Sequence, residues 1–128
     1  MTQEKFNVFA KNFVKKTTNV LYDKGKSYAL NRDDRLEHFK RAAEYLSTSP
    51  KEACLAQLTK YLVSIRDMVC ARRPYSDKET IEFSPEQWDE KIGDAINYLV
   101  LLRALVIDEE SNNKAIQPSN KQINNWRQ

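Results

Sequence analysis

The fold is decided by residues 84–107, which read SPEQWDEKIGDAINYLVLLRALVI. The opening Ser-Pro-Glu-Gln is a capping pattern with proline at the first helical position, so a helix is expected to begin here. The helix is amphipathic at first and becomes almost wholly apolar from Leu99 onward. Such a segment must be covered on most sides, which places it at the centre of a bundle or between subunits.

Three further helices are predicted ahead of this segment, and they span residues 2–22, 33–46 and 50–71. The first carries phenylalanines at three- and four-residue steps, and Gly25 is expected to stop it in a left-handed conformation. The third opens on the capping box that begins at Ser49. Beyond residue 110 the chain is rich in Asn, Gln and Ser, so residues 111–128 are predicted to be a mobile tail or a short appended helix.

Composition limits the fold class and the compartment. The 128 residues include only two glycines and four prolines, which argues against a turn-rich sheet protein. No apolar run reaches 18 residues, so neither a membrane span nor a signal peptide is expected. Cys54 and Cys70 lie on one predicted helix, roughly 24 Å apart, and so they cannot pair. We therefore expect a cytoplasmic, all-α domain over residues 1–110 with partly buried free thiols.

The last helix carries the first candidate site. Glu90 and Asp94 are four residues apart and share one helix face, with Asn97 and Tyr98 one turn further on. Carboxylates at this spacing suit Mg²⁺, which binds oxygen ligands and bridges to phosphate. Gly93 costs about 1 kcal/mol relative to alanine in mid-helix, so close packing or a ligand is expected beside it. The alternative is an ordinary solvated first turn whose acids favour the helix N-terminus.

The third helix supplies a second polar face. Lys60, Ser64 and Asp67 recur at i, i+4 and i+7, so they line one side of that helix. Lys60 is positioned to meet a phosphate, and Asp67 to complete a three-carboxylate cluster. A solvated stripe with an intrahelical ion contact is the alternative interpretation. The apolar face of the same helix is predicted to comprise Leu55, Leu58, Leu62, Ile65 and Val69.

These motifs together resemble a known family. The matching stretches are Lys24-Gly25-x-x-Tyr28, the segment from Asp34 to Ala43, Lys60-x-x-x-Ser64-Ile65-x-Asp67, and the segment from Glu90 to Leu99. They are similar to small phage and prophage proteins that are distantly related to the MazG-like all-α nucleoside triphosphate pyrophosphatases. The resemblance covers roughly residues 20–107, and its sharpest element is Gly-Asp-x-x-Asn-Tyr.

The resemblance implies a four-helix MazG-like bundle that is a homo-oligomer, either a dimer or a tetramer. It also implies a Mg²⁺ ion held by Glu-x-x-Glu on one helix and Glu-x-x-Asp on the next. Asp94 matches the last acidic position, whereas Glu90 lies one residue too far upstream and Lys91 takes the acidic place. The acidic pair of the earlier helix is absent here. Lys60, Ser64 and Asp67 occupy the comparable face of that helix. A lysine among the site residues favours phosphate binding without hydrolysis.

Two functions follow as expectations. The leading one is a divergent Mg²⁺-dependent nucleotide pyrophosphohydrolase or nucleotide-binding protein of phage origin. In it Glu90 and Asp94 are catalytic, and with Asp67 they are the metal ligands. The ligand-binding residues are Lys60, Ser64, Asn97 and Tyr98. The alternative is a non-catalytic accessory protein that sequesters a nucleotide signal or inhibits a host defence protein.

Nucleic-acid binding is a weaker possibility. Residues 1–41 carry ten Lys or Arg against five Asp or Glu, which could steer an anionic partner to this half of the chain. The lysines are scattered, however, and aromatic residues do not alternate with them as they do in nucleic-acid-binding grooves.

Overall fold

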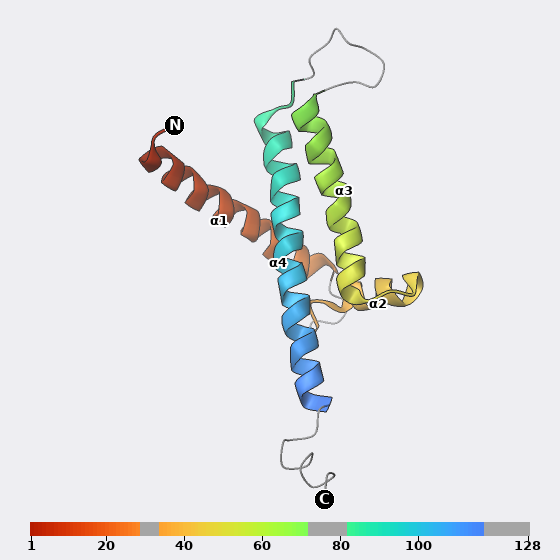
Figure 1. The fold of residues 1–128 in the computed structure, drawn as a ribbon. Coiled ribbons are helices and arrows are strands. Elements are labelled where there is room, and N and C mark those ends of the chain that lie inside the picture. Colours follow the sequence, from red (N-terminus) through yellow and green to blue (C-terminus); the bar gives the residue numbers. More distant parts are fainter. Residues whose placement is uncertain (29–33, 72–81, 117–128) are drawn as a thin grey trace, which may run out of the picture.

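The structure is a computed structural model that describes residues 1–28, 34–71 and 82–116. Within these ranges the chain forms helices and no strands (Figure 1). The helices are α1 (Gln3–Tyr28), α2 (Glu37–Leu46), α3 (Pro50–Cys70) and α4 (Pro85–Ile116). The prediction of an all-α fold is therefore confirmed. None of the described helices combines the length and apolarity that crossing a membrane requires.

The four helices form an open arrangement around α4 (Figure 1). Helices α3 and α4 run antiparallel and pack along their lengths, and α2 packs across the lower end of α3. Helix α1 crosses α4 near the middle of α4, and the N-terminal half of α1 extends away from the other helices. The core lies where α2, α3 and α4 meet, and its buried residues are Leu36, Phe39, Cys54 and Leu105.

Both predicted capping boxes are present. The Ser49 hydroxyl accepts a hydrogen bond from the Glu52 amide at 3.2 Å, and the Glu52 carboxylate accepts one from the Ser49 amide at 3.4 Å. Ser84 and Gln87 make the same reciprocal pair at the start of α4, at 3.2 and 2.8 Å. Each pair satisfies amide groups that a helix N-terminus otherwise leaves without a partner.

The prediction that Gly25 stops the first helix is wrong. Helix α1 continues through it to Tyr28, and no glycine among the described residues has a positive φ. A Cβ at Gly25 would lie 2.6 Å from Nε of Arg35, so this glycine lets the start of the α2 segment approach α1. Helix α2 begins later than predicted, because the Asp34 carboxylate accepts a hydrogen bond from the Leu36 amide at 3.0 Å ahead of it.

The apolar run of α4 is only partly covered within one chain. Leu99, Val100 and Ile107 keep 52%, 44% and 49% of their surface exposed, so the expected cover is not supplied by the described helices. Helix α4 also continues past residue 110 to Ile116, and the rest of the predicted tail lies outside the described residues.

The two cysteines differ in exposure. Cys54 is fully buried, its thiol donates to the carbonyl oxygen of Tyr98 at 3.6 Å, and burial raises its pKa to about 11. Cys70 is exposed at the end of α3, contrary to the prediction of partial burial. Both thiols are free, as the predicted spacing required.

Candidate functional site

A pocket of about 350 Å³ lies where α1 crosses the first half of α4. We call it the interhelix pocket. It brings together the Gly93–Asn97 segment and the face of α1 that contains Thr17. Its lining residues are Phe13, Lys16, Thr17, Val20, Lys24, Glu86, Asp89, Glu90, Gly93, Asp94 and Asn97. Three of the predicted site residues, Glu90, Asp94 and Asn97, are therefore in one place.

Gly93 sets how closely the two helices approach at this pocket. A Cβ built on Gly93 would lie 3.2 Å from the hydroxyl oxygen of Thr17, which is tighter than an ordinary van der Waals contact. Both Gly93 and Thr17 are buried. Of the two alternatives expected beside this mid-helix glycine, close packing is confirmed, and the neighbour is a residue of α1.

Asn97 is the most unusual residue of the pocket. Only 5% of it is exposed, and its Nδ2 donates to the carbonyl oxygen of Thr17 at 2.9 Å. A carbonyl oxygen only accepts hydrogen bonds, so the amide nitrogen of Asn97 must face Thr17 and its Oδ1 must face elsewhere. This oxygen is buried and has no hydrogen-bond partner. Burying an unpaired acceptor costs about 1–3 kcal/mol, so Asn97 is under-satisfied in the free protein.

Two ion pairs cross the pocket from α1 to α4. Lys24 lies 3.5 Å from the carboxylate of Asp94, and Lys16 lies 3.4 Å from that of Asp89. The Asp94 side chain is only 12% exposed, whereas both lysines are well exposed. The pocket thus places two exposed ammonium groups beside carboxylates, and an anionic ligand would compete with those carboxylates for the lysines.

A second pocket of about 220 Å³ adjoins the first and shares Lys24, Asp94 and Asn97 with it. We call it the aromatic pocket. Tyr61 stacks on Tyr98 with ring centroids 5.2 Å apart, and Phe39 meets the edge of Tyr98 at 6.3 Å. Burial, with a smaller contribution from Tyr61, raises the pKa of Tyr98 to about 12, so its hydroxyl stays protonated. The predicted ligand-binding residue Tyr98 lies here.

The predicted residues of α3 are not brought to either pocket. Lys60 and Asp67 are exposed, and the Ser64 hydroxyl donates to the carbonyl oxygen of Lys60 at 3.1 Å. The residues of α3 that reach the aromatic pocket are Gln57 and Tyr61. Because successive residues turn by about 100° around a helix, Lys60 faces a different direction from its neighbour Tyr61.

The predicted inner face of α3 is wrong in part, since Leu58 is buried as predicted but most of its expected neighbours are not. Leu55, Leu62 and Val69 were expected on the inner face, yet they keep 51%, 49% and 68% of their surface exposed. The buried positions of α3 are Ala53, Cys54, Leu58 and Met68. Apolar residues occur on several sides of this helix, so periodicity does not determine which side packs.

The predicted Mg²⁺ site does not fit the described residues. No three His, Cys, Asp or Glu side chains in the described ranges gather closely enough to hold a metal ion. Asp67 is exposed on α3 and does not line the interhelix pocket, while Asp94 is paired with Lys24. A site for Mg²⁺ needs several oxygen ligands around one point, and these carboxylates do not supply them within one chain.

The polar residues that α1 contributes to the interhelix pocket were not predicted from the sequence; they are Lys16, Thr17 and Lys24. Only Lys24 had a signal, because it belongs to the stretch that resembles the family. Nothing in the sequence indicates that α1 crosses α4 at Gly93, since the two segments are far apart in the chain.

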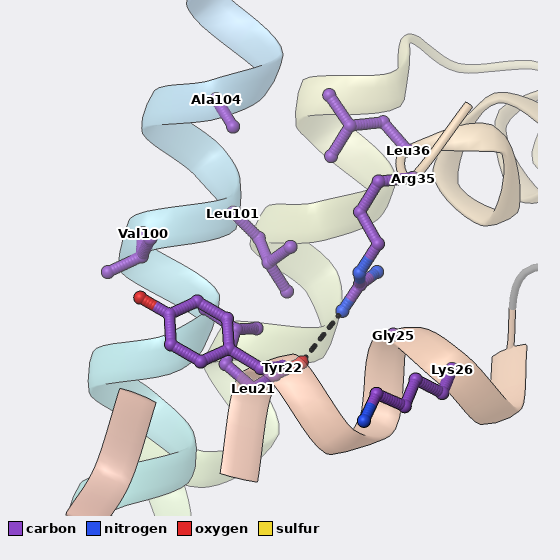
Figure 2. Close-up of a pocket in the computed structure, with 9 residues that line it drawn as sticks. All are labelled: Leu21, Tyr22, Gly25, Lys26, Arg35, Leu36, Val100, Leu101 and Ala104. Atoms are coloured by element: carbon purple, nitrogen blue, oxygen red, sulfur yellow. Dashed lines mark hydrogen bonds between the residues drawn. The ribbon is translucent and has the colours of Figure 1, made fainter. Parts of the chain in front are cut away.

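A further groove has none of the predicted site residues in its lining, although it shares Leu21, Arg35 and Leu101 with the aromatic pocket. This apolar groove of about 820 Å³ is lined by Leu21, Tyr22, Gly25, Lys26, Arg35, Leu36, Val100, Leu101 and Ala104 (Figure 2). Arg35 reaches across it and donates from Nη2 to the carbonyl oxygen of Leu21 at 3.4 Å.

Comparison of the chain with protein-family models, curated proteins and solved structures yields no match.

Proposed function

We propose that this protein binds a nucleotide across the interhelix pocket and the aromatic pocket. The observation that carries the proposal is Asn97, which lines both pockets and whose buried Oδ1 has no hydrogen-bond partner. A ligand that displaces the groups covering this oxygen and donates one hydrogen bond to it removes the cost of leaving it unpaired. The amino group or ring N–H of a nucleobase is such a donor.

The surroundings of Asn97 suit the remaining parts of a nucleotide. The aromatic pocket offers the Tyr61 and Tyr98 rings beside the base. On the other side, Lys16 and Lys24 are exposed cations that can leave their carboxylates to meet phosphate oxygens. Apolar walls with a few polar groups of defined direction are typical of small-molecule sites.

Between the two expected functions, the ion pairs favour binding without hydrolysis. Asp89 and Asp94 are each paired with a lysine of α1, and the described residues do not gather a metal-binding cluster. Nucleotide sequestration by a non-catalytic protein therefore ranks ahead of Mg²⁺-dependent pyrophosphate release in this proposal. A hydrolase would need further carboxylates from a neighbouring subunit.

The proposal is tested by thermal melts with adenosine, ATP and the other common nucleoside triphosphates, each with and without Mg²⁺. Binding stabilises the folded state by about 2.7 kcal/mol when the ligand is at 100 times its dissociation constant. We expect stabilisation by at least one triphosphate without a requirement for Mg²⁺, and no release of pyrophosphate in a parallel assay. If no nucleotide shifts the melting temperature, the proposal is wrong.

The decisive variant is Asn97→Leu, which replaces the amide with a side chain that lacks polar atoms. We expect it to abolish the nucleotide response. Its free energy of unfolding reports the balance between the lost hydrogen bond to Thr17 and the removed unpaired oxygen, so the nucleotide response is compared at temperatures where the variant is folded. Ser64→Ala is the matched control, since Ser64 was predicted to bind the ligand yet lies outside both pockets. A full nucleotide response in Asn97→Leu would contradict the site.

A further inference from the structure

The apolar groove of about 820 Å³ combines a hydrophobic wall with a cationic edge (Figure 2). Helix α4 contributes Val100, Leu101 and Ala104, whose side chains carry no polar atoms. Facing them, α1 and the segment ahead of α2 contribute Lys26 and Arg35. The groove therefore presents two kinds of surface that one amphiphilic ligand can contact at the same time.

The charges of this groove are unbalanced. Its lining includes Lys26 and Arg35 but no Asp or Glu. Neither cation has an ion-pair partner among the described residues, whereas the lysines of the interhelix pocket lie beside carboxylates. An anion in the apolar groove would thus meet two cations without displacing a carboxylate of the described residues from either of them.

Arg35 is held at the groove by a close approach to α1. A Cβ built on Gly25 would lie 2.6 Å from Nε and 3.2 Å from Cδ of Arg35, so a larger residue there would displace this side chain. The hydrogen bond from Nη2 to the Leu21 carbonyl oxygen is long, at 3.4 Å. A guanidinium has five N–H donors, and two parallel ones match the two oxygens of a carboxylate.

We propose that the apolar groove binds an alkyl carboxylate, with its carboxylate at Arg35 and Lys26 and its chain along the wall formed by α4. The groove volume lies within the range of roughly 300–1,000 Å³ that is typical of small-molecule pockets. Val100 and Tyr22 keep 44% and 65% of their surface exposed, so the groove is open to a ligand from solvent. The proposal is independent of the nucleotide site, because Asn97 does not line this groove.

Charge favours a small anionic ligand over the C-terminal segment of the same chain as the occupant. Residues 117–128 contain Lys121 and Arg127 and no acidic residue, so they would add positive side chains to an edge that is already cationic. An alkyl carboxylate supplies the negative charge and the apolar surface in one molecule.

The first test is calorimetric titration of the full chain with decanoate below its micelle concentration. We expect one site per chain. Each methylene moved from water to an apolar surface is worth about fourfold in affinity, so decanoate should bind about fivefold more tightly than octanoate in this open groove. Octanoate should in turn bind more tightly than 1-octanol, which has the same chain and no charge. Absence of decanoate binding, or tighter binding of 1-octanol than of octanoate, overturns the proposal.

The charge of the groove is tested at two residues that line it and neither of the other two pockets. Lys26→Gln should weaken decanoate binding about threefold, and Val100→Glu should weaken it at least tenfold by placing a carboxylate beside the ligand. Val100→Gln controls for size and polarity and should weaken binding less than Val100→Glu. Val69→Glu on α3, where the side chain is 68% exposed, controls for net charge. Equal effects of Val69→Glu and Val100→Glu contradict the site.

The position of the ligand has its own test, which needs no variant. In methyl NMR spectra of the unmodified chain, decanoate should shift the resonances of Val100 and Leu101 and leave those of Leu62 and Val63 on α3 unchanged. Shifts of equal size on both helices overturn the proposal. The nucleotide response of Val100→Glu should match that of the unmodified chain, so failure of one site is distinguished from failure of the other.

Discussion

The buried part of the contact by which α1 crosses α4 is made by Thr17, Gly93 and Asn97. Thr17 lies against Gly93 and accepts a hydrogen bond from Asn97 through its main-chain oxygen. The glycine allows the approach, and the asparagine fixes the position of the helix that approaches. The Asn97 side chain consequently has one satisfied polar atom and one unsatisfied atom.

The tightness of this contact predicts a coupling between Thr17 and Gly93. Gly93→Ala gains up to about 1 kcal/mol of helix propensity, but its methyl group meets the Thr17 hydroxyl at 3.2 Å. In a Thr17→Ala background that obstacle is absent. Urea unfolding of the unmodified chain, both single variants and the double variant should therefore show Gly93→Ala to be more stabilising in that background by about 0.5–1 kcal/mol. Strictly additive effects would contradict the contact.

At this scale the sequence was informative where a residue breaks a local rule. Gly93 was predicted to have a special role because glycine is unfavourable in the middle of a helix, whereas Asn97 was assigned from its position one turn after Asp94. Lys60, Ser64 and Asp67 break no rule, and their assignment depended on the rotational orientation of α3. Apolar residues on several sides of α3 left that orientation undetermined.

At the scale of whole elements, the helix starts that were predicted well are those that depend on hydrogen bonds between residues close in sequence. Pro50 and Pro85 follow serine caps whose hydrogen bonds are all within three residues. The end of α1 and the start of α2 depend instead on Arg35 packing over Gly25. That contact is tertiary, so residue patterns near Gly25 alone favoured the wrong boundary.

The cap of α3 gives a prediction at this scale. Ser49→Ala removes the acceptor for the Glu52 amide, so the free energy of unfolding should fall by about 1 kcal/mol. Ser64→Ala is the control, because its hydroxyl bonds only to a carbonyl one turn earlier in the same helix. Chemical denaturation should show a change within about 0.5 kcal/mol for the control. Equal losses in both variants would contradict a specific capping role.

In the whole molecule, a charge cluster joins the start of α2 to the second half of α4. Lys40 lies 2.7 Å from the carboxylate of Asp34 and 3.0 Å from that of Asp108. Lys51 adds a contact of 2.7 Å to Glu109. These pairs link the α2–α3 end of the molecule to the part of α4 that lies below the core (Figure 1).

This cluster makes stability sensitive to acid. The hydrogen bond from Lys40 lowers the pKa of Asp34, so this carboxylate binds its proton less readily in the folded than in the unfolded chain. Its contribution is therefore present above the ordinary aspartate pKa of about 3.9 and is lost as the pH falls below that value. Lys40→Met should make the loss of stability below about pH 4 less steep.

The expected magnitude is modest, under about 1 kcal/mol, because the Asp34 and Lys40 side chains are about one third exposed and water screens the pair. Lys60→Met is the control, since this exposed lysine has no ion pair among the described residues. Melting curves over this pH range should show the control parallel to the unmodified protein. An equal change in both variants would show that net charge, rather than the cluster, sets the acid sensitivity.

The α1–α4 crossing also bears on the order in which the chain folds. The Thr17–Asn97 hydrogen bond joins residues 80 apart in sequence, whereas α3 and α4 are separated by a much shorter connection. Closing a longer loop costs more chain entropy, and contacts of large sequence separation form slowly. We therefore expect the α3–α4 hairpin to form first and α1 to dock on it afterwards. In that order the interhelix pocket is assembled last, and a ligand held there is expected to slow the release of α1 as the first step of unfolding.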